Sequence, residues 1–129
     1  MPSSAPGGSP QKPPRTTGFA HFRDATRYSG AGLRRLLRES AFRQELIIGL
    51  LALAGLALWG ADGAELAVFA VLLLILIAVE ALNTAIETLV DHLSPGWSEF
   101  ARDAKDLGSL AVAAVVAAMT LWLARVLFF

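Results

Sequence analysis

Hydrophobic residues dominate three long stretches in the second part of the chain, and charged side chains are rare in all three. A helix needs about 20 predominantly apolar residues to cross the roughly 30 Å hydrocarbon core of a bilayer. The pattern therefore predicts an all-α integral membrane protein with three transmembrane helices per chain. Their expected bounds are about residues 43–61, 65–90 and 105–129.

The segment from residue 18 to about residue 45 has a different pattern, in which apolar side chains recur among arginines at helical spacing. This spacing predicts an amphipathic helix, and such a helix next to a span is expected to lie in the membrane interface. Gly30 and Gly32 suggest a weak point in it, because glycine costs about 1 kcal/mol in a helix interior. Residues 1–17 are rich in Pro, Gly and Ser, which predicts a disordered tail before a single domain at 18–129.

Composition agrees with a membrane protein, since 55% of the residues are hydrophobic and the mean hydropathy is +0.56. The chain has no cysteine, which excludes disulfides and thiolate metal sites. Lys and Arg cluster before residue 44, next to the predicted spans. Anionic lipid headgroups therefore suit this basic segment better than nucleic acid does. The positive-inside rule places the amino terminus and the loop at 92–106 in the cytoplasm, and the carboxyl terminus outside.

A row of polar side chains interrupts the second apolar stretch: Glu80, Asn83, Glu87 and Asp91. At about 100° per residue they fall within roughly 80° of one helix face. Carboxylates inside a spanning helix cost several kcal/mol by most estimates, so a partner, metal or substrate usually compensates them. The structural alternative is a pair of carboxylates neutralised by protonation or by hydrogen bonds between helices. We interpret the row as a functional site, which oligomerisation is expected to shield from lipid.

Further charged residues stand close to this row in the predicted topology. Glu39 lies at the end of the interfacial helix, and Lys105 and Asp106 lie at the start of the third span. Carboxylate oxygens suit Mg²⁺, and a lysine neutralises phosphate charge, so the group favours phosphoryl transfer. The glycine-rich phosphate loops of soluble NTPases and protein kinases are absent from the sequence. From spacing alone, a proton or cation translocator is an open alternative.

Three segments resemble the prokaryotic diacylglycerol kinase family. They are Ala-Phe-Arg-Gln-Glu at 41–45 preceded by Glu39, Val-Glu-Ala-Leu-Asn-Thr-Ala-Ile-Glu at 79–87, and Ala-Lys-Asp-Leu-Gly-Ser at 104–109. Order, spacing and the three-span layout match over about residues 16–129. The resemblance implies a homotrimeric enzyme of the bacterial inner membrane that phosphorylates diacylglycerol with MgATP to phosphatidic acid and ADP. Undecaprenol kinase is the alternative within the family, and a non-enzymatic or ion-translocating oligomer is the alternative outside it.

The resemblance also implies roles for individual residues. Glu80 would be the catalytic base, Glu39 and Glu87 would hold Mg²⁺, and Asn83 would order the site. The implied ATP contacts are Tyr28, Glu39, Glu87, Lys105 and Asp106. The implied lipid contacts are Ala41, Phe42, Arg43, Gln44, Glu45, Glu80 and Ser109. Sites in the family are shared between neighbouring subunits, so Glu39 and Glu80 are expected to serve one site from different protomers.

The chain departs from the family pattern in two places. Some relatives have arginine where this chain has His21, and the loop at 94–99 lacks the Glu and His of enterobacterial-type members. Trp97 in that loop is interpreted as an interfacial anchor, with stacking on a nucleotide base as the alternative.

Overall fold

A computed structural model describes residues 19–129, with side chains from Arg23 onward. In this range the chain forms four helices: α1 (Phe19–Leu36), α2 (Ser40–Trp59), α3 (Gly63–Leu93) and α4 (Glu99–Phe128). The last three are each long and apolar enough to span a membrane, which confirms the predicted fold class. The predicted disordered tail at 1–17 and the side chain of His21 lie outside the described residues.

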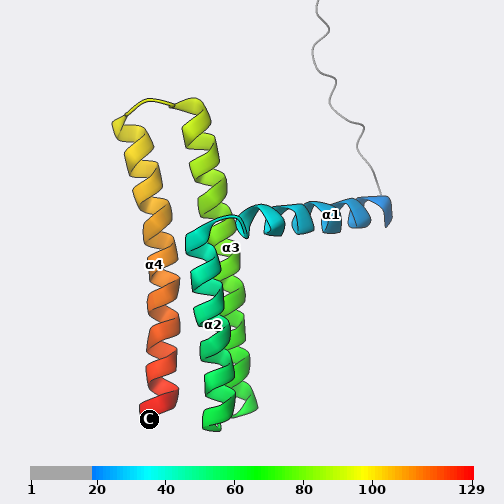
Figure 1. Cartoon of the computed structure of the whole chain (residues 1–129), viewed down its shortest axis with the longest axis vertical. Coiled ribbons are helices and arrows are strands. Elements are labelled where there is room, and N and C mark those ends of the chain that lie inside the picture. Colours follow the sequence, from blue (N-terminus) through cyan, green and yellow to red (C-terminus); the bar gives the residue numbers. More distant parts are fainter. Residues whose placement is uncertain (1–18) are drawn as a thin grey trace, which may run out of the picture.

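The three spanning helices differ in length. α2 has 20 residues and α3 and α4 have 31 and 30, which at 1.5 Å per residue is about 30 Å against about 45 Å. α2 therefore matches the hydrocarbon core, whereas α3 and α4 exceed it by roughly 15 Å. Figure 1 shows where the excess lies: α3 and α4 pack antiparallel and extend together beyond the start of α2.

The amphipathic segment is shorter than predicted, because α1 ends at Leu36 rather than near residue 45. Gly30 and Gly32 do not interrupt it, and the break falls later, at residues 37–39. The backbone N–H groups of residues 37–39 bond the last carbonyl groups of α1, at 2.9–3.1 Å. Arg43 bonds the turn itself, since its Nη1 donates to the carbonyl oxygens of Leu37 at 3.1 Å and Arg38 at 2.9 Å. The break lets α1 point sideways, away from the bundle (Figure 1).

Local capping residues fix the ends of the spans. Gly60 adopts φ +102° after α2, a left-handed conformation that glycine reaches without steric cost. Asp62 and Glu65 form a capping box at the start of α3, with hydrogen bonds of 2.8 and 3.0 Å. Ser98 caps α4 by accepting from the backbone N–H of Ala101 at 3.2 Å. Both turns between spans are therefore specified locally.

The apolar core lies where α2, α3 and α4 meet. Its buried members are Leu56, Phe69, Leu73, Leu76, Val112 and Met119. Much of the remaining apolar surface points outward, including Ile48 and Leu58 on α2 and Leu74 on α3. In a bilayer, lipid tails or neighbouring helices cover such faces.

α1 contacts α3 near its own carboxyl end. Leu36 is only 3% exposed, and with Gly32 and Arg35 it faces a segment of α3 that includes Ala81 and Leu89. An arginine-rich amphipathic helix favours the membrane interface. α1 contacts the segment of α3 that follows Glu80.

Candidate functional site

A polar pocket of about 290 Å³ opens between α2, α3 and α4, and it contains most of the residues predicted from the sequence. Its lining residues are Glu39, Ala41, Phe42, Glu45, Glu80, Asn83, Thr84, Glu87, Ser109 and Val112. Three separate sequence segments thus meet in one place, as the resemblance implied.

Four glutamates converge on the pocket from two helices and a turn. Glu80 and Glu87 lie on the same face of α3, Glu45 projects from the first turns of α2, and Glu39 precedes α2. Glu80 is 7% exposed, and its charged neighbours are Glu45, Glu87 and Glu39, in decreasing order of interaction. Like charges this close require protons, a cation or a ligand between them.

Two buried oxygen atoms in the pocket have no hydrogen-bond partner among the described residues: Oε2 of Glu45 and Oδ1 of Asn83. The large majority of buried polar side-chain atoms are paired, so each exception requires an explanation. On its other side the amide of Asn83 is satisfied, because Nδ2 donates to Oε1 of Glu87 at 3.3 Å. The pocket therefore offers two unused oxygen acceptors, one from a carboxylate and one from an amide.

The carboxylate and amide oxygens of the pocket suit Mg²⁺ that binds together with a phosphate. They do not form a preassembled metal site. Among the described residues, no three His, Cys, Asp or Glu side chains are grouped closely enough to hold a metal ion. Mg²⁺ commonly binds one or two carboxylates and takes its other ligands from water and phosphate, so an open set of oxygens is compatible with it. Glu39 forms an ion pair with Arg35, which is the structural role of that carboxylate within this chain.

Several predicted site residues lie elsewhere. Lys105 donates to Oδ1 of Asp91 at 2.5 Å, one helical turn beyond the pocket. Tyr28 is 72% exposed on α1, and Asp106 and Gln44 are exposed and do not line the pocket.

Arg43 is used in the turn between α1 and α2. Glu39 and Glu80 line the same pocket of a single chain. That neighbouring subunits share the site stays a prediction, because the structure describes one chain. The 3.6-residue repeat places side chains on one helix face, but it does not say which neighbouring chain they meet.

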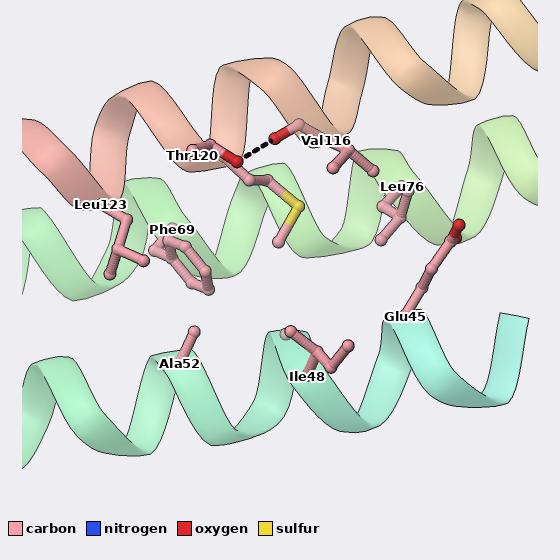
Figure 2. Close-up of a pocket in the computed structure, with 10 residues that line it drawn as sticks. Glu45, Ile48, Ala52, Phe69, Leu76, Val116, Thr120 and Leu123 are labelled. Carbon is pink, nitrogen blue, oxygen red and sulfur yellow. Dashed lines mark hydrogen bonds between the residues drawn. The ribbon is translucent and has the colours of Figure 1, made fainter. Parts of the chain in front are cut away.

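An apolar groove of about 160 Å³ lies between α2, α3 and α4. In Figure 2, Glu45 reaches toward α3 at one end of the groove, and Phe69 and Leu123 lie at the other. Glu45 lines both the groove and the polar pocket. An apolar space and a polar one therefore lie on either side of one carboxylate.

Sequence reasoning missed two lining residues, Thr84 and Val112. Thr84 follows Glu80 by four positions and Val112 follows Ser109 by three, so helical spacing alone places each beside a predicted residue. It also gave no role to Gly108 of α4, whose close approach to Asn83 of α3 depends on the distance between the two helices.

Fold and site together define a small helical membrane protein with an acidic pocket and an apolar groove between its three long helices. A family model described as prokaryotic diacylglycerol kinase matches residues 27–127. The chain is similar to a diacylglycerol kinase of a Sinorhizobium species, with 41% identity over 115 residues that cover 89% of this chain and 84% of the relative.

Two further relatives extend this likeness. The diacylglycerol kinase of Escherichia coli K12 is 38% identical over 110 residues, covering 83% of this chain and 89% of the relative. The diacylglycerol kinase of Haemophilus influenzae is 31% identical over 116 residues, covering 89% and 98%. The chain belongs to the prokaryotic diacylglycerol kinase family and is a lipid kinase.

Proposed function

We propose that this protein transfers the γ-phosphoryl group of MgATP to diacylglycerol, giving phosphatidic acid and ADP. The relatives are named diacylglycerol kinases. The observation that carries the proposal is the position of Glu45, which lines both the carboxylate pocket and the apolar groove. A lipid with one free hydroxyl fits this shape when its head enters the pocket and an acyl chain follows the groove.

Glu80 is proposed as the general base. It is the most buried carboxylate of the pocket, and none of the salt bridges in the described range involves it. As the primary hydroxyl oxygen of the lipid attacks the γ-phosphorus, its proton passes to a Glu80 carboxylate oxygen and the bond to ADP breaks. Proton removal by a positioned side chain typically contributes about 10²–10⁴-fold to the rate.

Glu39 and Glu87 are proposed to hold Mg²⁺, which would neutralise phosphate charge during transfer. Asn83 donates to Glu87 and so orients that carboxylate toward the pocket. Lys105, one turn beyond, is placed to neutralise the nucleotide phosphates once they replace Asp91 as its partner. Arg35 must release Glu39 for this role. Tyr28 and Asp106 do not line the pocket, and the proposal does not depend on them.

A homotrimer is proposed as the active assembly, because large apolar side chains on all three spans face outward from one chain. Mixing of inactive variants examines which residues subunits share. Since Glu39 and Glu80 line one pocket of one chain, verified mixed oligomers of Glu39→Gln and Glu80→Gln are expected to stay at background activity. Recovery of activity in the mixture would instead show that these two carboxylates come from different protomers.

We also propose that the amino terminus and the loop between α3 and α4 face the cytoplasm of a bacterial inner membrane, with the carboxyl terminus outside. Arginines cluster before residue 44, and the turn between α2 and α3 contains none. Because the sequence lacks cysteine, Trp97→Cys and Phe129→Cys can each be labelled with a membrane-impermeant thiol reagent in intact cells. Labelling at residue 129 alone supports this orientation, and labelling at residue 97 alone reverses it.

The central experiment measures transfer of radiolabelled phosphate from ATP in detergent micelles, with diacylglycerol and undecaprenol as separate acceptors. Phosphatidic acid as the main product supports the proposal. Preferential phosphorylation of undecaprenol would move the chain to the other branch of the family. Absence of both products from an intact oligomer would favour a role without catalysis.

A further inference from the structure

α4 approaches α3 unusually closely at Gly108, which is buried beside the polar pocket. A Cβ atom added to Gly108 would lie 2.1 Å from Oδ1 and 3.2 Å from Cγ of Asn83, whereas real Cβ contacts essentially never fall below 3.0 Å. Only glycine is compatible with the present position of the Asn83 side chain. Small residues at helix crossings in membranes allow such close approach.

The chemistry of the neighbours determines which end of the Asn83 amide faces Gly108. The Glu87 carboxylate only accepts hydrogen bonds, so the NH₂ group of Asn83 must face it, as the 3.3 Å bond shows. The amide oxygen then points the other way, into the space that the missing side chain of Gly108 leaves open. This oxygen is buried and has no hydrogen-bond partner among the described residues.

We propose that Gly108 is a positioning residue of the site. It leaves room for the Asn83 amide oxygen, and Asn83 in turn holds Glu87. The inference rests on the proposed function, in which Glu87 binds Mg²⁺.

The identity of the clashing atom separates this role from ordinary packing. Oδ1 lies at the far end of a flexible side chain and not in the α3 backbone. Rotation of Asn83 can therefore accommodate a methyl group at position 108 without separating the helices. The rotation breaks the Asn83–Glu87 hydrogen bond, so Gly108→Ala is expected to harm catalysis more than folding.

A double-mutant cycle tests the proposal with wild type, Gly108→Ala, Asn83→Ala and the combined variant. The cycle is read from kcat, from the Mg²⁺ concentration at half-maximal rate and from the thermal unfolding midpoint in detergent. Gly108→Ala should lower kcat by about tenfold or more and raise the Mg²⁺ requirement, with little change in the unfolding midpoint. Added to Asn83→Ala, it should change kcat and the Mg²⁺ requirement by less than about twofold, because its clash partner is gone. Gly55→Ala, at a helical glycine with open space around it, serves as the control and should match wild type.

Equal losses from Gly108→Ala in both backgrounds would overturn the proposal, because the effect would then arise from helix packing. Wild-type kinetics in Gly108→Ala would overturn it as well. If Asn83→Ala is too slow to assay, stabilisation against unfolding by Mg²⁺ with a non-hydrolysable ATP analogue replaces kcat as the measured quantity. This binding cycle also separates the two proposals, since it remains measurable if wild type shows no lipid kinase activity.

Discussion

Both halves of α3 carry glutamates, but their surroundings are opposite. In the first turn, Glu65 completes the capping box with Asp62, its carbonyl oxygen accepts from Nε1 of Trp122 at 3.2 Å, and its carboxylate lies 3.8 Å from Nη1 of Arg125. In the half that lines the polar pocket, Glu80 is more deeply buried, forms no salt bridge within the described range and has only other carboxylates as charged neighbours.

This difference distinguishes a structural part of α3 from a functional one. Every interaction at Glu65 joins two parts of the same chain and closes the bundle. The polar pocket instead leaves Oε2 of Glu45 and Oδ1 of Asn83 without a partner in the described part of the chain, at a cost of about 1–3 kcal/mol for each group. A site that binds substrate and a cation only during turnover requires such unused groups.

The largest effect is expected from Glu80→Gln, compared with Glu65→Gln. Removing the proposed base should reduce the rate of phosphate transfer by about 10²–10⁴-fold while the oligomer still forms. Glu65→Gln, in the first turn of the same helix, should retain the wild-type rate. The measurement is kcat in mixed micelles, with oligomer size checked by light scattering. More than about a tenth of the wild-type rate in Glu80→Gln would contradict the assignment.

A smaller effect is expected when the proposed metal ligands are changed. Glu39→Gln and Glu87→Gln should each raise the Mg²⁺ concentration at half-maximal rate by about tenfold or more, because a hard cation loses a charged oxygen. Glu99→Gln is the matched control, since Glu99 is exposed and lies 3.6 Å from Arg102 outside the pocket. Unchanged Mg²⁺ titrations in both variants would remove these carboxylates from the metal site.

A change at the start of α3 should lower the stability of the fold and leave the catalytic rate unchanged. Asp62→Ala removes the side-chain acceptor for the backbone N–H of Glu65 and is expected to destabilise the protein by about 1 kcal/mol. Catalysis by the remaining folded enzyme should be unchanged. Thermal unfolding in detergent, alongside kcat at a temperature well below the transition, measures both. A fall in kcat with an unchanged unfolding midpoint would contradict a purely structural role for the first turn of α3.

The smallest effect is expected from Arg125→Gln. The contact between Arg125 and Glu65 is long, and the arginine side chain is 57% exposed, so its loss should cost less than about 1 kcal/mol. The same unfolding assay measures it. A larger shift of the unfolding midpoint than that of Asp62→Ala would mean that the ion pair, and not the capping box, contributes most to stability at the start of α3.

Local patterns along the sequence were sufficient for the spans and for the composition of the site. Length and hydropathy determined three membrane helices, and the 3.6-residue repeat determined that Glu80, Asn83 and Glu87 share a face. The segments at 41–45, 79–87 and 104–109 determined the family. The spans and the shared helix face each depend on one segment at a time, and local spacing specifies them. The family depends on the three segments and their order along the chain.

Distances between helices were decided only by the tertiary structure. They include the proximity of Glu45 to Glu80 and the position of Glu45 between the groove and the pocket. The pairing of Lys105 with Asp91 and the close approach of Gly108 to Asn83 are further examples. The end of α1 at Leu36 belongs with them, because Arg43 stabilises the turn from the next helix. The crossing and register of packed helices depend on all the side chains at their interface. No single stretch of sequence contains that information.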